Sequence, residues 1–504
     1  MDTELSFEDS IGQQLVISFE GPVIDRHCSE AITHFRVPNI LISCRNITGR
    51  QQLTQLCSSL RENIEQNLNT PALLFLQYDE SCAQVLSPFM TVPPSPLALQ
   101  AIQDESSAYT AAAIFSAQLK QVGIDAIIGP SLNINTDRRN RELGLFSFGD
   151  TPETVSRFAS SMTRGYIDGG ILPVCYAFPG AGQLYSDENH TVEQNDKTLD
   201  ELMECELVPF VKIIENGGSA LMCAPAYYSA FDEEKTISSM SVPLVQNLLR
   251  ETLGYSSVLF SPVIDLPNIS DSFPIETVAV ESLKTGCDFL ILSHRHDHLE
   301  KIHSSIAEAI ESSYIPHETH LESRRRIATL KKQLKERKDF EKPNESAPLI
   351  VSAMVERSIT VIQNNEDLPF ELGSFPIFLG RNTGSNSFAK WMYDHIGGEY
   401  FEFSESIDND ELHRLMEEVS DNSSIVIAIK DGHLFETQLS MANALGATGI
   451  PTMAVSLHNP YDLLFLNPSI YSIAAFEDCE RSFEAVRKVL THERIATGTV
   501  SIHW

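Results

Sequence analysis

Three histidines stand at alternate positions in one segment, and their type and spacing could hold a metal ion. They are His294, His296 and His298. Alternate residues of an extended segment point to the same side, and imidazole nitrogens are common zinc ligands. No H-E-x-x-H pattern adds an acidic partner, and histidines at a strand end are more often hydrogen-bonded surface groups. Metal binding is therefore an alternative interpretation, and the leading one contains no metal and no cofactor.

Carboxylates, amides and basic side chains follow a series of short apolar runs, and such a mixture suits a polyhydroxylated ligand such as a sugar. The set comprises Glu20, Arg45, Asp79, Glu80, Asp137, Arg139, Asn140, Asp187, Glu188, Asp265 and the three histidines. These groups can act together only if the fold brings the ends of the runs to one place.

The first 300 residues supply such a scaffold, because β-rich apolar runs alternate there with longer amphipathic stretches. The runs are Leu15 to Phe19, Pro38 to Ser43, Ala72 to Tyr78, Ile124 to Pro130, Leu172 to Phe178, Ala220 to Ala224, Ser257 to Ser261 and Cys287 to Ser293. Eight such βα units predict a (β/α)₈ barrel, whose functional residues follow the carboxyl ends of its strands.

The remaining third of the chain predicts a connector and a second α/β domain. Residues 318–347 contain a charged helix that we expect to be solvated on one face and to pack Ile327, Leu330 and Leu334 on the other. The predicted domains are therefore a barrel at 1–317, a helical linker at 318–347 and a smaller three-layer αβα domain at 348–504. Its strand candidates are Phe375 to Leu379, Tyr400 to Phe403, Ser424 to Ile429, Thr452 to Leu457 and Tyr471 to Phe476.

Composition narrows the classes of partner. Among 504 residues, 36 Lys and Arg oppose 69 Asp and Glu, so the formal net charge is −33. Such a chain repels phosphate backbones and anionic membranes, which argues against nucleic-acid and membrane binding. The acidic start lacks the features of a signal peptide, and the nine cysteines form no C-x-x-C pair, so we expect a cytoplasmic protein with reduced thiols. A small carbohydrate is the expected ligand, and a protein partner stays open.

Several segments resemble glycoside hydrolase family 3, in particular its two-domain β-N-acetylglucosaminidases. The resemblance rests on Ile11-Gly-Gln13, Gly123-Ile-Asp-Ala-Ile-Ile-Gly-Pro130, Asn135-Thr-Asp-Arg-Arg139-Asn140, Ser147-Phe-Gly-Asp-Thr-Pro152, Phe178-Pro-Gly-Ala-Gly182 and His458-Asn-Pro-Tyr-Asp462. It covers nearly the whole chain and implies a retaining glycosidase, in which one carboxylate attacks the sugar and a second group transfers the proton. It also implies that Asp79, Arg139 and Asn140 contact the sugar or brace the site.

The resemblance places the two reactive groups on residues that cannot react. The nucleophile position falls on Pro262, and the acid/base histidine of the family's KHFPGHGD loop falls on Ala181. The Lys of that loop is Tyr176, which would stack on a sugar ring or, as we favour, fill the vacated space. Loss of either group typically lowers the rate by about 10³ to 10⁶.

Three interpretations follow from these substitutions. The first and favoured one is a pseudo-glycosidase that keeps the scaffold and binds a sugar or a partner. The second is an active β-N-acetylglucosaminidase with relocated carboxylates, for which Asp265, Asp187 and Glu188 are the candidates. The third is a metal-binding protein at His294, His296 and His298.

Overall fold

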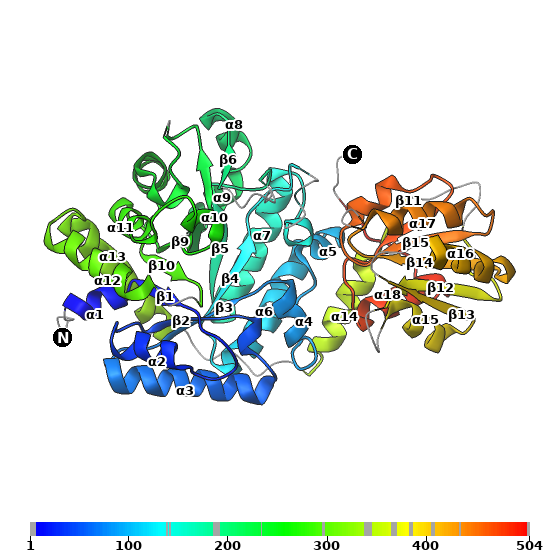
Figure 1. Ribbon diagram of the computed structural model, residues 1–504, viewed down its shortest axis with the longest axis horizontal. Helices are drawn as coiled ribbons and strands as arrows, with labels where there is room; N and C mark the ends of the chain where they lie inside the picture. The colour runs from blue at the N-terminus through cyan, green and yellow to red at the C-terminus, as the bar shows by residue number, and fades with distance from the viewer. Residues whose placement is uncertain are drawn as a thin grey trace. The chain divides into compact units, whose positions relative to one another are not determined.

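The structure is a computed structural model that describes residues 7–137, 140, 143–184, 192–232, 234–294, 298–336, 345–363, 370–382, 387–404, 409–432 and 435–500 (Figure 1). The chain divides into two compact units. The barrel unit comprises residues 1–93, 108–143 and 150–347, and the C-terminal unit comprises residues 94–107, 144–149 and 348–504.

The barrel unit contains a closed sheet of parallel strands in the order β1-β10-β9-β7-β5-β4-β3-β2, which confirms the predicted (β/α)₈ fold. The strands are β1 (Leu15–Ile17), β2 (Asn39–Ile42), β3 (Leu73–Gln77), β4 (Ala126–Ser131), β5 (Leu172–Phe178), β7 (Ala220–Cys223), β9 (Leu259–Val263) and β10 (Phe289–Leu292). Each of the predicted runs overlaps one of these strands. The runs are apolar throughout because a parallel strand covered by helices is buried on both faces.

Helices surround this sheet (Figure 1). They include α2 (Arg26–Thr33), α3 (Arg50–Leu68), α4 (Glu80–Leu86), α6 (Glu105–Val122), α7 (Pro152–Asp168), α9 (Val208–Glu215), α11 (Ile275–Thr285) and α12 (Leu299–Glu311). Side-chain caps begin several of them: the hydroxyl of Thr151 accepts from the amide of Thr154 at the start of α7, and the carboxylate of Asp25 accepts from Cys28 at the start of α2. Within the described ranges, no helix is both long enough and apolar enough to cross a membrane.

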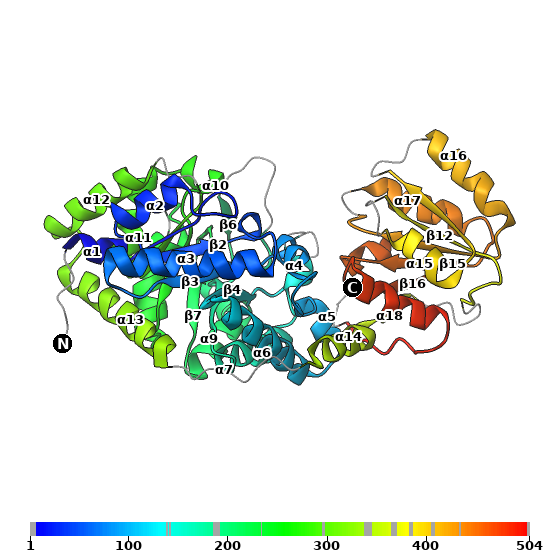
Figure 2. The same cartoon turned by 90° about the horizontal axis from the view of Figure 1, so that it is seen from below.

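Helix α13 (His317–Glu336) corrects the expectation of a linker at 318–347. Its predicted apolar residues, Ile327, Leu330 and Leu334, are buried as expected. They belong, however, to the same buried cluster as the inward-facing strand residues Val16 and Phe289, so α13 is part of the barrel unit (Figure 2). The helical spacing of these three apolar residues indicated that one face is buried, but the sequence could not show what that face packs against.

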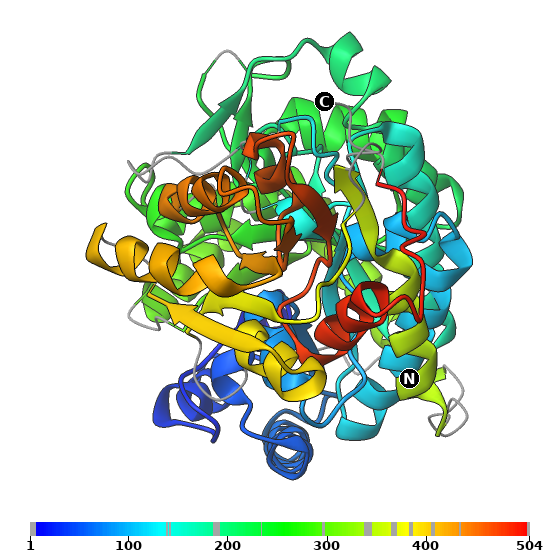
Figure 3. The ribbon, with the colours of Figure 1, turned by 90° about the vertical axis from the view of Figure 1, so that its right-hand side faces the viewer.

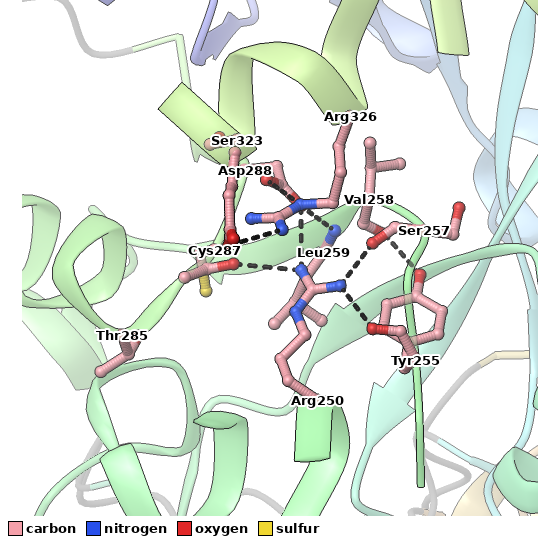
Figure 4. Close-up of polar contacts among 12 residues, drawn as sticks. Arg250, Tyr255, Ser257, Val258, Leu259, Thr285, Cys287, Asp288, Ser323 and Arg326 are labelled. Carbon is pink, nitrogen blue, oxygen red and sulfur yellow. Dashed lines mark hydrogen bonds and ion pairs between the residues drawn. The ribbon is translucent and has the colours of Figure 1, made fainter. Parts of the chain in front are cut away.

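Asp288 joins three elements of the barrel unit through a buried ion-pair network (Figure 4). Its carboxylate, which has no exposed surface, pairs with Arg250 at 3.0 Å and with Arg326 of α13 at 2.9 Å. It also accepts from the amide of Leu259 at the start of β9 at 2.8 Å. A buried carboxylate is tolerated when it is paired and hydrogen-bonded in this way, so the network fixes α13 to the strands that precede it.

The C-terminal unit contains a six-stranded sheet in the order β11-β16-β15-β14-β12-β13 with helices on both faces (Figure 3). Its strands are β11 (Thr360–Gln363), β12 (Pro376–Arg381), β13 (Glu399–Phe403), β14 (Ser424–Ile429), β15 (Thr452–Ser456) and β16 (Tyr471–Ala474). One face packs on α14 (Ala347–Ser358), α15 (Phe388–Ile396) and α18 (Glu480–Leu490), and the other packs on α16 (Asn409–Glu418) and α17 (Glu436–Gly446). The predicted αβα domain is confirmed.

Two features of this unit were not predicted. The antiparallel edge strand β11 is short and mostly half-exposed, so its sequence carries no continuous apolar run. In addition, α5 (Pro96–Ala101) and the turn Gly144–Phe146 belong to this unit, where Leu97 and Leu145 join the core beside β12 and β14. The sequences of these two segments do not indicate which of the two cores they join.

We expect Asp288→Asn to lower the free energy of unfolding of the barrel unit by about 3–5 kcal/mol, because two arginines would lose their buried counter-charge. Chemical denaturation followed by circular dichroism measures this change. Glu30→Gln, which removes an exposed pair with Arg26, is the control and should change stability by less than about 1 kcal/mol. Equal effects of the two substitutions would contradict a stabilising role of the Asp288 network.

Lys331 of α13 predicts a pH dependence of stability. Its Nζ donates to Gln13 Oε1 at 2.5 Å and to the carbonyl of Pro71 at 3.4 Å, and no described carboxylate forms an ion pair with it. Burial lowers the pKa of this amine to about 7 from an ordinary value of 10.5, against a smaller opposing effect of Asp125. Between these two pKa values the unfolded chain binds one more proton than the folded one, so this group makes stability rise with pH from about 7 to 10.5.

We therefore expect Lys331→Met to raise the free energy of unfolding by roughly 1–3 kcal/mol at pH 6.5, with a gain that shrinks as the pH approaches 10. Urea unfolding of both proteins at pH 6.5, 8 and 9.5 measures the difference, and the other titrating groups cancel in it. A difference that does not vary with pH would show that the amine stays charged in the folded protein.

Candidate functional site

The loop after β5, Phe178 to Gly182, has a backbone that is fixed by several hydrogen bonds. The amide of Ala181 donates to Asn133 Oδ1 at 2.9 Å, and the amide of Gly180 donates to the carbonyl of Ala177 at 2.8 Å. Asn140 supports the same loop from β4's side, since its Nδ2 donates to the carbonyls of Gly182, at 3.0 Å, and Leu184. The loop is therefore held by amide side chains of the preceding connection.

The two glycines of this loop are required by close packing. A Cβ at Gly182 would lie 1.6 Å from the carbonyl oxygen of Ile134, and a Cβ at Gly180 would lie 2.6 Å from the Cβ of Glu206. Glu206 is buried and pairs with Lys197, and the Tyr228 hydroxyl donates to the Gly180 carbonyl at 2.9 Å. Burial, with a contribution from the Glu206 charge, raises the pKa of that hydroxyl well above its ordinary value, which keeps it a donor.

Asn140, predicted to contact sugar, uses its side-chain hydrogen-bonding groups within the protein. It is 4% exposed, both of its amide hydrogens go to the loop carbonyls described above, and its Oδ1 accepts from the amide of Leu143 at 2.9 Å. Of the two roles that the resemblance implies, these contacts are those of a residue that braces the loop.

Tyr176 contacts the inward-facing side chains of the barrel, together with Met222 and Val263. Burial raises the pKa of its hydroxyl to about 12, with a smaller contribution from the charge of Asp79 and an opposing hydrogen bond to Ser131. These contacts support the interpretation in which this ring fills space inside the barrel rather than the one in which it stacks on a sugar.

Asp79 begins α4, where its carboxylate accepts from the amide of Cys82 at 2.8 Å and caps the helix. It is half-buried and lies near enough to Tyr176 for its charge to act on that hydroxyl. The remaining predicted groups Arg139, Asp187 and Glu188 lie outside the described residues, so their predicted roles stay predictions.

The seventh strand of the barrel, β9, carries no free carboxylate at its end. Pro262 lies within this strand, and Asp265 follows it with 4% of its surface exposed. Asp265 accepts from the amide of Ser293 at 2.8 Å through Oδ1 and from the Ser293 hydroxyl at 2.6 Å through Oδ2. Both of its oxygens are thus used to hold the end of β10.

His294 is part of a polar triad with Glu20 and Arg45. Its Nε2 lies 3.0 Å from Glu20 Oε1 and its Nδ1 lies 2.6 Å from Arg45 Nη1, and the same arginine nitrogen lies 3.3 Å from Glu20 Oε1. The three residues follow β10, β1 and β2, which are neighbours in the closed barrel. The sequence predicted that each of them follows a strand, but it did not predict that they contact one another. They become adjacent only because the first strand of the barrel pairs with the last.

The predicted metal set is not assembled in the part of the chain that the structure describes. His298 is exposed at the start of α12, His294 is bonded within the triad, and His296 lies outside the described residues. Among the described residues no three His, Cys, Asp or Glu side chains form a group that could hold a metal ion. The metal interpretation therefore gains no support here and stays a prediction.

The closed parallel barrel with polar side chains at the carboxyl ends of its strands defines a (β/α)₈ barrel protein. Residues 6–330 match the Glycosyl hydrolase family 3 N terminal domain, and the chain belongs to this family. The resemblance inferred from the sequence is confirmed.

Individual relatives agree with this assignment. Beta-hexosaminidase A of Pseudoalteromonas piscicida is 24% identical over 347 residues, which cover 64% of this chain and 56% of that protein. Beta-hexosaminidase of Chromobacterium violaceum is 26% identical over 283 residues, which cover 55% of this chain and 77% of that protein. The solved structure of a glycoside hydrolase family 3 beta-N-acetylglucosaminidase from Paenibacillus sp. str. FPU-7 has a TM-score of 0.90 at 24% identity and covers 99% of both chains. The chain is a β-hexosaminidase-like member of the family.

We expect Gly182→Ala to destabilise the barrel unit by about 3 kcal/mol or more, because the added methyl group meets backbone that no rotamer change can move. Gly49→Ala is the matched control, since a Cβ there meets nothing within 4 Å and its backbone is extended. Thermal unfolding of the three proteins tests the claim. An unchanged midpoint for Gly182→Ala would show that the loop does not need its close approach to Ile134.

Proposed function

We propose that this chain is a non-hydrolysing member of glycosyl hydrolase family 3 that retains a carbohydrate-binding barrel mouth. The family resemblance of the sequence carries the proposal, because it places the nucleophile and acid/base positions on Pro262 and Ala181. Neither side chain can attack an anomeric carbon or transfer a proton.

The contacts of Asp265 support this proposal over its main alternative. A relocated nucleophile needs a carboxylate oxygen free to approach the sugar, whereas both oxygens of Asp265 accept from Ser293 and the residue is almost entirely buried. Release of this carboxylate would break both hydrogen bonds that it makes with Ser293 at the end of β10. The other candidates for that role, Asp187 and Glu188, lie outside the described residues.

The carbohydrate part of the proposal draws on the relatives, whose names describe enzymes that act on β-linked hexosamines. The barrel mouth of this chain keeps polar side chains at neighbouring strand ends, and Glu20, Arg45 and His294 are partly exposed there. Donors and acceptors placed side by side in this manner suit the hydroxyl groups of a sugar.

Hydrolysis of a fluorogenic β-N-acetylglucosaminide at high protein concentration tests the proposal. We expect no turnover above background for the wild type, no further loss in Asp265→Asn, and a gain of measurable turnover in an Ala181→His, Pro262→Asp double variant, because it restores the proton-transfer and nucleophilic groups. Asp168→Asn, at an exposed position of α7, controls for the removal of a charge.

The opposite pattern would overturn the proposal. If the wild type and Asp168→Asn both turn over and Asp265→Asn is silent, Asp265 acts as a relocated carboxylate and the chain is an enzyme. Turnover that survives all single substitutions would point to catalytic groups outside the described residues.

A further inference from the structure

We infer that Arg45 at the mouth of the barrel forms a recognition site for a carboxylate group carried by a saccharide. The inference deepens the proposed function, on which it rests, by naming the chemical class of the ligand. It is carried by the geometry of the Glu20, Arg45 and His294 triad and by the buried residues that fix this triad.

The contacts within the triad indicate which ring nitrogen of His294 accepts a hydrogen bond. A guanidinium nitrogen can only donate, so Nδ1 of His294, at 2.6 Å from Arg45 Nη1, must be an acceptor. Nε2 of the same ring lies 3.0 Å from Glu20 Oε1. Glu20 Oε1 also lies 3.3 Å from Arg45 Nη1, so the three side chains close a triangle that holds one edge of the guanidinium.

Buried side chains beneath the triad fix two of its three loops. Asn46, next to Arg45 and with no exposed surface, donates to the carbonyls of Phe19 at 3.0 Å and Gly21 at 2.7 Å, which flank Glu20. Its Oδ1 accepts from the amide of Ser43 at 2.9 Å, so the turn that carries Arg45 is tied to the turn that carries Glu20. A side chain held in this way loses less entropy when it binds a ligand.

The third loop is fixed by Asp265. Its two bonds to Ser293 hold the residue that directly precedes His294. The carboxylate that the sequence offers as a replacement nucleophile is thus a positioning residue for the imidazole of the triad. Nothing in this arrangement requires Asp265 to contact a ligand.

The unused edge of the guanidinium determines the class of ligand. Within the described residues Arg45 makes polar contacts only through Nη1, which leaves the Nε and Nη2 hydrogens directed away from the triad. Two parallel N–H groups of this kind match the two oxygens of a carboxylate. The Arg45 side chain is 41% exposed, so a ligand can reach it.

Titration of the full-length protein with D-glucuronate and with D-glucose tests the inference, because the two sugars differ only in a carboxylate at C6. We expect glucuronate to bind at least about 10-fold more tightly by isothermal titration calorimetry or by ligand-observed NMR. Arg45→Gln should abolish this preference, and Arg45→Lys should keep only a minor part of it, since an ammonium cannot form the paired contact. Arg26→Gln, which removes an exposed arginine of α2, should leave the preference unchanged.

Three outcomes would overturn the inference: equal binding of the two sugars, a preference that survives in Arg45→Gln, or an equal loss in Arg26→Gln. Both ligands are monosaccharides without a glycosidic bond, so the result does not depend on hydrolysis. A hydrolytically active wild type would overturn the proposed function while leaving this preference intact, and a silent wild type without the preference would do the reverse.

Discussion

Closure of β1 against β10 is the constraint on which the rest of the barrel unit depends. The parallel pairing of Leu15, Val16 and Ile17 with Leu290, Ile291 and Leu292 joins segments that are more than 270 residues apart in the chain. It encloses the stacked rings of Phe260 and Phe289, whose centroids are 4.6 Å apart, and it sets the loops after β10, β1 and β2 side by side. The triad of Glu20, Arg45 and His294 exists only because the sheet closes.

The structure separates the parts of a family 3 fold that shape the loops from the parts that react. The backbone at Ile134 lies so close to Gly182 that any side chain at position 182 would collide with it, whether or not the protein is a catalyst. Asn140 donates to loop carbonyls that would otherwise lack this hydrogen bond. No comparable packing constraint requires a reactive side chain at Ala181 or Pro262. The loop geometry therefore does not depend on a reactive side chain at these two positions, whereas loss of a loop glycine or of Asn140 would cost the scaffold stability.

Sequence patterns predicted the barrel strands well because each strand is buried on both faces and leaves a continuous apolar run. They predicted that Ile327, Leu330 and Leu334 are buried, but not that α13 belongs to the barrel unit, because amphipathicity reports a buried face and not its partner. They missed β11, whose residues are mostly half-exposed. At the site, the residue types were predictable and their contacts were not. From the sequence Asp265 is a candidate nucleophile, but in the fold Ser293, at the end of β10, donates to both of its oxygens.

The strongly negative charge of the chain limits how an anionic ligand could be recognised. At a net charge of −33 the long-range field opposes the approach of a carboxylate and lowers the association rate, although at physiological ionic strength it is screened beyond about 8 Å. Selectivity must then come from short-range contacts, and a guanidinium held at one edge by Glu20 and His294 provides these at its other edge. The partial neutralisation of Arg45 by Glu20 reduces its general attraction for anions but leaves its geometry intact. Moderate salt would therefore weaken the long-range repulsion more than it weakens the paired contact between Arg45 and a ligand carboxylate. A ligand of the proposed class should then be selected by shape and hydrogen bonding rather than by charge alone.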